Sequence, residues 1–132
     1  MLKAAFLDRD GVINKEVNYL HKTADFRYTK DCIKGLKLLK SIGFELVIVT
    51  NQAGIAKGIF TQRDHQNLSN WLIQDLAQNG IELLDYIFCP HHPEGIIEEY
   101  TVDCDCRKPN PGMLLNARKN HNIDLENSIL IG

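Results

Sequence analysis

The sequence has 132 residues, of which 44% are hydrophobic and 8% aromatic, which suits one globular domain with a modest core. The formal net charge is only −2 and the lysines and arginines are scattered, so no nucleic-acid-binding surface is expected. The opening MLKAAFLDRD reaches charged residues after a short apolar run, unlike a secretory signal or a membrane span. We therefore expect a cytoplasmic protein that contacts neither nucleic acid nor membrane.

Strand-like and helix-like segments alternate along the first half of the chain. Residues 2–7 form a short apolar run that is typical of a buried parallel strand. Asp31 is expected to cap a helix that ends near Gly43. The apolar residues of this helix are Ile33, Leu36, Leu38 and Leu39. Residues 44–49, FELVIV, are apolar and rich in β-branched side chains, so they predict a second buried strand.

The second half of the chain continues this alternation. Residues 61–64, TQRD, have the form of a capping box and open a helix that ends at 79–80. Residues 86–89 and 128–131 predict two more strands, and Pro111 starts a helix between them. The apolar residues of the two helices are Leu68, Trp71, Leu72 and Leu76, then Met113, Leu114 and Ala117. The whole pattern predicts an α/β fold with a mainly parallel sheet.

Polar clusters follow three of the predicted strands. DRDG follows the first strand, TNQAG the second, and a Cys/His segment ending in CRKPNPG the third. The carboxyl ends of parallel strands border the ligand crevice of an open sheet. We therefore expect the three clusters to converge on one edge of the sheet.

Asp8 and Asp10 are the candidate catalytic pair. An aspartate is a competent nucleophile towards phosphorus, with which it forms an aspartyl-phosphate. A second carboxylate can protonate the leaving alcohol and later deprotonate water. Because two carboxylates and a phosphate repel one another, a hard cation such as Mg²⁺ is expected between them. The alternative is that both carboxylates cap a turn before Gly11. A calcium-binding loop uses similar spacing, but it requires a Glu at its twelfth position, and this sequence has none there.

Two further clusters offer groups that can bind a phosphate. Thr50 and Asn51 can donate hydrogen bonds to phosphoryl oxygens, although a polar turn is the simpler interpretation of these two residues alone. Arg107 offers a planar fork and Lys108 a point charge, although such a pair is usually solvated. The order of the three clusters, each after a strand, favours a phosphate site.

The cysteines suggest a metal centre. Cys89 and His91, then Cys104 and Cys106, form two short pairs across a twelve-residue spacer, enough for a tetrahedral Cys₃His zinc site. With no open position, the zinc would be structural and would hold the loop that carries the two cations. The alternative is a set of metal-free thiols. Among the remaining residues, Cys32 and Trp71 are expected in the core, and His21, His65 and His121 at the surface or in packing.

The motifs DRDGVIN, VTNQAGIAKGIF, CPHHPEG and CDCRKPNPGM resemble the haloacid dehalogenase superfamily. Within it, they are similar to the D-glycero-D-manno-heptose 1,7-bisphosphate 7-phosphatases and the related histidinol-phosphate phosphatases, over essentially the whole chain. The resemblance implies a three-layer Rossmann-like fold and a phosphoric monoester hydrolase. It also implies Asp8 as the nucleophile, Asp10 as the general acid/base, and Thr50 with Asn51 as the phosphate-binding second motif.

The resemblance implies further roles. Lys108 would be the third-motif cation and Arg107 a substrate contact, and Mg²⁺ would be held by the Asp8 carboxylate and the Asp10 main-chain carbonyl. His91, not His92, would be the histidine ligand of zinc. The stretches GVIN, NQAGIAKG and RKPNPGM favour the heptose branch, in lipopolysaccharide precursor synthesis, over the histidinol branch. The family implies a monomer in which loops 14–28 and 90–106 shape specificity.

One departure from the family concerns its acidic fourth motif, which follows the fourth strand and completes the Mg²⁺ site. No residue of 1–132 is expected in that role, so the C-terminal part of the usual fold is expected to be absent. The apolar edge of the fourth strand would then favour self-association. We expect a single phosphatase domain over 1–132 with a zinc-binding loop at 89–106. The alternative is an inactive, zinc-stabilised fragment that binds phosphate or a partner.

Overall fold

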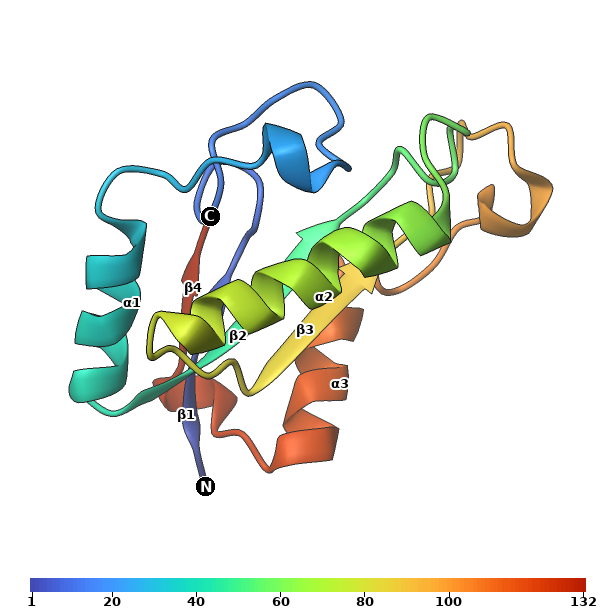
Figure 1. The fold of residues 1–132 in the computed structure, drawn as a ribbon. Helices are drawn as coiled ribbons and strands as arrows, with labels where there is room; N and C mark the ends of the chain where they lie inside the picture. Colours follow the sequence, from blue (N-terminus) through green and yellow to red (C-terminus); the bar gives the residue numbers. More distant parts are fainter.

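The computed structural model describes residues 1–132 and contains one parallel sheet of four strands (Figure 1). The strands are β1 (Lys3–Leu7), β2 (Phe44–Asn51), β3 (Asp85–Cys89) and β4 (Ile129–Ile131), in the spatial order β3-β2-β1-β4. In the register, Leu7 pairs with Ile48 and with Ile131. The four predicted strands and their parallel arrangement are confirmed.

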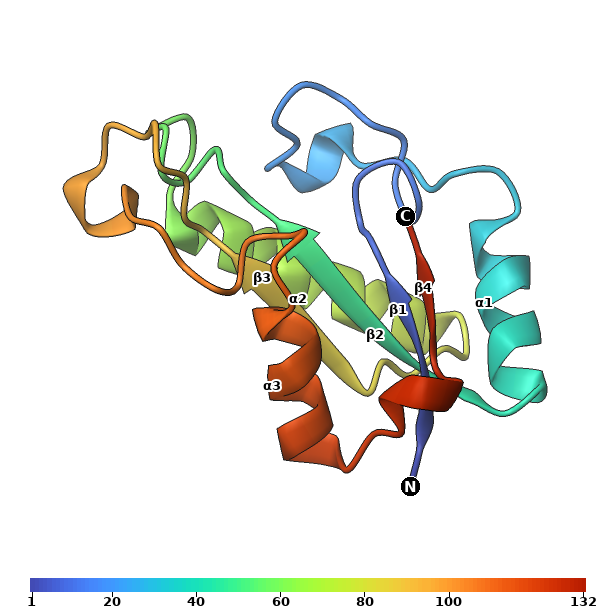
Figure 2. The same cartoon turned by 180° about the vertical axis from the view of Figure 1, so that it is seen from behind.

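Three helices cover the sheet: α1 (Cys32–Ser41), α2 (Gln62–Gln78) and α3 (Gly112–His121). Figure 1 shows α1 and α2 over one face, and Figure 2 shows α3 on the opposite face. Short 3₁₀ turns occur at Thr23–Asp25, Glu98–Tyr100 and Leu125–Asn127. No helix combines the length and the apolar character needed to cross a bilayer. The predicted three-layer α/β architecture is confirmed.

The alternation of side chains along the central strands builds two cores. Ala5 and Leu7 point into the core beneath α1 and α2, whereas Ala4 and Phe6 point into the core beneath α3. In β2, Leu46 and Ile48 belong to the first core, and the intervening valines to the second. Because both faces of these strands are covered, their sequences are continuously apolar instead of alternating.

The helix starts match the prediction in position but not always in mechanism. At α2, Oγ1 of Thr61 accepts from the backbone N–H of Asp64, whose carboxylate accepts from the N–H of Thr61, so the capping box is confirmed. At α1, Asp31 precedes the helix, but its φ of 60° is left-handed and its side chain caps nothing. A capping side chain requires extended backbone at this position. The expectation that the Asp31 side chain caps α1 was therefore wrong. Leu38, one of the apolar residues of this helix, is 61% exposed.

The residues expected outside the chemistry pack as predicted. Cys32 and Trp71 are half-buried against the core beneath α1 and α2. His21 stacks on Phe60, and Nε2 of His121 lies 2.8 Å from a carboxylate oxygen of Asp85. His65 is fully buried, a packing position whose contacts are described below.

Candidate active site and metal centre

The three polar clusters lie at one edge of the sheet. The strands β1, β2 and β3 are parallel, and they end at Leu7, Asn51 and Cys89. Each cluster begins at or directly after the end of its strand. The predicted convergence is confirmed, and an ion pair and several hydrogen bonds join the first two clusters to the third.

Asp8 is the first residue after β1. Its backbone N–H donates to the carbonyl of Ile131 at 3.0 Å, which ties it to β4. Its carboxylate oxygen Oδ1 lies 3.1 Å from Nζ of Lys108 and accepts from the backbone N–H of Arg9 at 2.9 Å. The second oxygen, Oδ2, accepts no hydrogen bond. Asp8 therefore has one oxygen held by a cation and one that is free to react or to bind a metal ion.

Asp10 lies on a tight turn that brings its carboxylate back beside the sheet. Gly11 has a φ of 86°, a left-handed value that glycine adopts without steric cost, and its N–H donates to the carbonyl of Asn14. The Asp10 carboxylate accepts hydrogen bonds from Arg9, Asn14 and Gln52. Its main-chain carbonyl accepts none, which leaves that oxygen available as a ligand for a hard cation. Mg²⁺ binds carboxylate and carbonyl oxygens, so Asp8 and Asp10 fit this ion.

Thr50 and Asn51 end strand β2. Thr50 is fully buried, and its hydroxyl accepts from Nε2 of Gln52 at 2.9 Å. The Asn51 amide holds the backbone of Lys108 from two sides: Oδ1 accepts from the N–H of Lys108 at 2.9 Å, and Nδ2 donates to its carbonyl at 3.2 Å. Sequence reasoning expected Asn51 to contact phosphate, and that role stays a prediction. In this structure its side chain positions the lysine.

The two predicted cations are placed differently. Nζ of Lys108 donates to the carbonyl of Val49 at 2.9 Å as well as contacting Asp8. Arg107 is half-buried, and its guanidinium forms no hydrogen bond or ion pair. A cavity of about 410 Å³ opens beside Lys108, but residues such as Met113, Leu114 and Leu130 line it. Its apolar walls do not suit a phosphate, so the Asp8 side of Lys108 is the better phosphoryl position.

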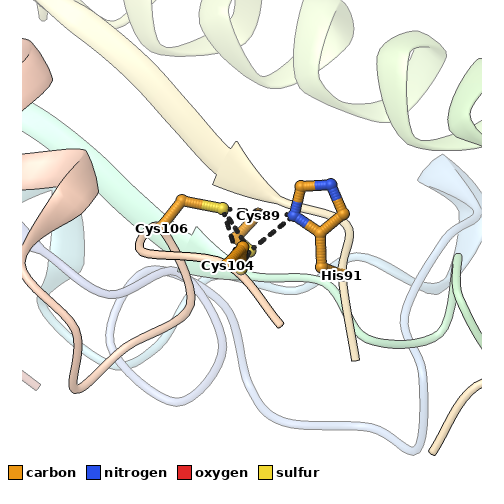
Figure 3. A group of neighbouring side chains, drawn as sticks. All are labelled: Cys89, His91, Cys104 and Cys106. Atoms are coloured by element: carbon orange, nitrogen blue, oxygen red, sulfur yellow. Dashed lines mark hydrogen bonds between the residues drawn. The ribbon is translucent and has the colours of Figure 1, made fainter. Parts of the chain in front are cut away.

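The predicted zinc ligands form one cluster (Figure 3). The sulfur atoms of Cys89, Cys104 and Cys106 and Nδ1 of His91 all lie within 4.8 Å of one another, and no disulfide joins the thiols. The Cys89–Cys104 and Cys104–Cys106 sulfur distances are 3.5 and 3.3 Å, and Nδ1 of His91 lies 3.3 Å from the Cys106 sulfur. Tetrahedral Zn–S bonds imply about 3.8 Å between sulfurs. The Cys89 and Cys106 sulfurs are closer, 2.6 Å apart, so the cysteine sulfurs would have to move apart for the four side chains to hold a zinc ion.

Burial raises the pKa of the Cys89 and Cys106 thiols. Thiols bind metal as thiolates, so a bound cation would have to displace these protons. Cys89 ends β3, and Cys106 stands two residues before Lys108. A metal ion here would thus join the end of the sheet to the loop that carries the active-site cation.

Three loops pack together above the edge of the sheet. In loop 14–28, the hydroxyl of Tyr19 accepts from Nζ of Lys57 at 3.1 Å. In loop 90–106, the N–H groups of Ile96 and Ile97 both donate to the carbonyl of Ala56. The segment 52–60 therefore lies between the two loops that were expected to shape specificity and contacts both.

Sequence reasoning missed a group of buried polar residues around Asp10. They are Arg9, Asn14, Gln52 and Tyr86, all buried or half-buried, and they are joined by His65, which was expected only at the surface or in packing. A signal existed for Arg9, since an arginine next to a buried strand and between two acidic residues is well placed to be buried as an ion pair. No local signal pointed to Tyr86, because it meets Arg9 across 77 positions of sequence.

Comparisons with known proteins identify relatives of this chain. The family model described as polynucleotide kinase 3 phosphatase matches residues 3–132. The chain is 55% identical over 131 residues to the D-glycero-alpha-D-manno-heptose-1,7-bisphosphate 7-phosphatase of Photorhabdus laumondii. The match covers 99% of this chain and 72% of that one. It is 45% identical over 129 residues to the D-glycero-beta-D-manno-heptose-1,7-bisphosphate 7-phosphatase of Yersinia pestis; the match covers 98% of this chain and 69% of that one.

Two solved structures that resemble this chain are also of phosphatases. A HAD-like phosphatase of Mesorhizobium loti superimposes with a TM-score of 0.91 at 32% identity, covering 99% of this chain and 63% of that one. The D,D-heptose 1,7-bisphosphate phosphatase of B. bronchiseptica, complexed with magnesium and phosphate, has a TM-score of 0.77 at 29% identity, covering 93% and 65%. The chain thus spans slightly less than two thirds of these two solved proteins. It belongs to the haloacid dehalogenase superfamily and, within it, to the D-glycero-D-manno-heptose-1,7-bisphosphate 7-phosphatase family.

Proposed function

We propose that this protein is a Mg²⁺-dependent phosphatase that removes the 7-phosphate of D-glycero-D-manno-heptose 1,7-bisphosphate. The observation that carries the proposal is the pair formed by Asp8 and Lys108 at the carboxyl edge of the sheet, with one Asp8 oxygen free. A reactive carboxylate oxygen beside a fixed cation suits attack on a phosphoryl group. The names of the relatives support the substrate.

In the first half-reaction, Oδ2 of Asp8 attacks phosphorus and forms a P–O bond as the bond between phosphorus and the sugar oxygen breaks. The proton on Asp10 passes to that departing oxygen, which leaves as the alcohol. Lys108 offsets the charge that builds on the phosphoryl oxygens, with Thr50 and Asn51 as donors and Arg107 as a substrate contact.

In the second half-reaction, Asp10 is a carboxylate and takes a proton from water. The oxygen of that water attacks phosphorus, the bond to Asp8 breaks, and inorganic phosphate leaves. Asp10 is protonated again, and the cycle closes. When bound by the Asp8 carboxylate and the Asp10 carbonyl, Mg²⁺ supplies charge that reduces the repulsion between carboxylate and phosphate. The magnesium and phosphate named for the B. bronchiseptica protein support this choice of ion.

We further infer a structural zinc ion at Cys89, His91, Cys104 and Cys106, within a loop at 89–106 of a single phosphatase domain over 1–132. The fit of the four ligand atoms supports it. Free thiols suit the reducing cytoplasm, where heptose precursors of lipopolysaccharide are expected to be made. Loops 14–28 and 90–106 would shape the sugar subsite, and no nucleic acid or membrane partner is required.

The test is a steady-state assay of both anomers of the heptose bisphosphate, histidinol phosphate and p-nitrophenyl phosphate, in Mg²⁺ and in chelator. The alpha anomer is expected to be a good substrate because the relative at 55% identity is named for it. Faster turnover of histidinol phosphate would contradict the substrate. A protein that binds phosphate but turns over no ester would favour the inactive, zinc-stabilised alternative.

A further inference from the structure

A fully buried arginine lies between the two aspartates of the candidate active site. Arg9 has no exposed surface, although arginines are rarely buried unless they are paired. Its guanidinium donates to Oδ1 of Asp10 from Nε at 3.2 Å and from Nη2 at 2.8 Å. Two donors of one planar group on one oxygen restrain the rotation of the carboxylate more than a single point charge can.

The far side of the guanidinium is held as well. Nη2 donates to the carbonyl of Leu20 at 3.3 Å, and Nη1 makes a long hydrogen bond of 3.5 Å to the hydroxyl of Tyr86. That hydroxyl lies 3.3 Å from Nε2 of His65, a fully buried residue of α2. Because the Tyr86 oxygen accepts from Arg9, its own proton is available for His65. A continuous chain of contacts therefore runs from α2 through β3 to the turn after β1.

His65 and Tyr86, the two residues of this contact network that lie farthest from Asp10, are neutral. Burial and the nearby charge of Arg9 lower the pKa of His65 to about 4. Burial raises the pKa of Tyr86 to about 12. The neutral side chains of His65 and Tyr86 therefore orient the guanidinium without competing as charged groups for the Asp10 carboxylate.

The two oxygens of Asp10 are consequently not equivalent. Oδ1 accepts from Nε and Nη2 of Arg9 and from Nδ2 of Asn14 at 3.1 Å. Oδ2 accepts only from Nε2 of Gln52, at 3.2 Å. A carboxylate oxygen offers about two lone-pair sites, so Oδ1 is saturated and Oδ2 keeps one site. The Asp10 side chain is 29% exposed, which leaves room for a partner at that oxygen.

We propose, resting on the phosphatase function above, that Arg9 is a positioning residue that holds Oδ1 of Asp10 and so leaves Oδ2 as the proton-exchanging oxygen. The proton on Oδ2 passes to the sugar oxygen when the P–O bond breaks. A proton from water returns to Oδ2 when the aspartyl-phosphate is hydrolysed. Tyr86 and His65 maintain the orientation of Arg9.

Comparing kcat/KM for substrates with different leaving groups separates a role in positioning Asp10 from general damage to the active site. The sugar alkoxide needs a proton as it leaves, whereas p-nitrophenolate is a good leaving group without one. Loss of correct positioning of Asp10 should therefore lower kcat/KM for heptose bisphosphate much more than for p-nitrophenyl phosphate. We expect losses of about 100-fold for Arg9→Met and about threefold to tenfold for Tyr86→Phe with the sugar substrate. Arg9→Lys, which keeps the charge but not the fork, should fall between Arg9→Met and the parent.

Ser128→Ala is the control. The hydroxyl of Ser128 accepts from the backbone N–H of Ala4 at 2.9 Å and donates to the carbonyl of Asp124, so this variant also loses part-buried hydroxyl hydrogen bonds, but at the amino ends of the strands, away from Asp10. It should retain the parent ratio between the two substrates. Equal losses on both substrates in Arg9→Met and Tyr86→Phe would overturn the positioning role. If Arg9→Met does not fold, Tyr86→Phe decides the matter alone.

A structural readout keeps the positioning role separate from the proposed function. Crystal structures of the parent and of Tyr86→Phe and Arg9→Met should show the Asp10 carboxylate rotated in Arg9→Met and the guanidinium shifted in Tyr86→Phe. An unchanged carboxylate in Arg9→Met would overturn the inference whatever the activity. If the parent hydrolyses neither ester in Mg²⁺, the proposed function fails, and the orientation of Asp10 in these crystals still decides the role of Arg9.

Discussion

Nζ of Lys108 lies 3.1 Å from Oδ1 of Asp8, although the two residues are 100 positions apart in sequence. Both side chains are about a quarter to a third exposed, so the pair is reachable from solvent. A partly exposed ion pair contributes little to stability. Its value lies in placing a cation where a phosphoryl group would meet the free oxygen of Asp8.

Replacing Asp8 by Asn tests the nucleophile. The amide keeps the shape of the side chain but cannot attack phosphorus, so kcat should fall below about a tenth of the parent value, with folding and phosphate affinity nearly unchanged. Steady-state kinetics and calorimetric titration with inorganic phosphate measure the two effects. Asp31→Asn, which changes an exposed carboxylate that caps nothing before α1, is the control and should retain parent activity. Residual turnover above that tenth would contradict the assignment of Asp8.

Replacing Asn51 by Ala tests whether this side chain positions Lys108. Loss of both hydrogen bonds to the Lys108 backbone should let the ammonium drift from Asp8, and kcat should fall about tenfold or more. The control is Asn127→Ala, which removes an exposed side-chain hydrogen bond to Asp124 far from the site. A parent-like kcat for Asn51→Ala would show that the loop holds the lysine without help.

Metal analysis of protein purified without chelator should find about one zinc per chain. Cys104→Ser should lose it, whereas Cys32→Ser, which alters a thiol outside the cluster, should keep it. Removal of the metal should disorder loop 89–106 more than the sheet and cost less than the ~10 kcal/mol typical of isolated zinc fingers. Full zinc occupancy in Cys104→Ser would reject the ligand set.

Zinc binding should also release protons. Burial raises the pKa of the Cys89 and Cys106 thiols, so both are protonated at pH 7 in the metal-free protein. Titration calorimetry of the metal-free protein in buffers of different ionisation enthalpy should detect release of at least two protons per zinc. An enthalpy that does not depend on the buffer would contradict binding through these two thiols.

The buried His65 should make stability depend on pH. Its folded-state pKa is about 4, against about 6.5 in the unfolded chain, so between these values the unfolded state binds more protons. The free energy of unfolding should therefore be fully retained above pH 6.5 and should fall by up to about 3 kcal/mol as the pH falls to 4. The groups that face the ring are Arg9, Asp10 and Tyr86.

Urea denaturation at several pH values measures this dependence. His65→Gln should show a flatter profile between pH 4 and 6.5, whereas His92→Gln, which changes a histidine outside the core, should follow the parent. If His65→Gln and the parent have parallel profiles, the acid sensitivity arises from other groups.

The fold was predictable because its signals are local. Short apolar runs marked the four strands, and the box at Thr61 and Asp64 marked the start of α2 within one residue. Strand β2 extends two residues beyond the predicted 44–49, because Thr50 and Asn51 pair with Phe88 and Cys89. That extension depends on a neighbouring strand, which a local pattern does not contain.

The reactive residues of the candidate site could be predicted from the sequence, but the buried residues that hold them could not. Asp8, Asp10 and Lys108 are reactive types at strand ends, so their chemistry indicated their place. Arg9 is different, because its burial depends on Tyr86 and on the carbonyl of Leu20, which only the folded chain brings together. Residue type alone favours an exposed arginine.

The two-sided contact of Asn51 with Lys108 has the pattern of a strand pairing, carried by one side chain. The side-chain amide of Asn51 accepts from and donates to the Lys108 backbone, as the peptide group of a neighbouring strand would. The hydrogen-bond pattern of the sheet therefore continues onto a loop that is not a strand. Strand β2, and not the loop between β3 and Lys108, then fixes the position of Lys108. Insertions or exchanges in 92–103, between the proposed zinc ligands, could therefore alter which sugar fits while the distance between ammonium and nucleophile stays constant.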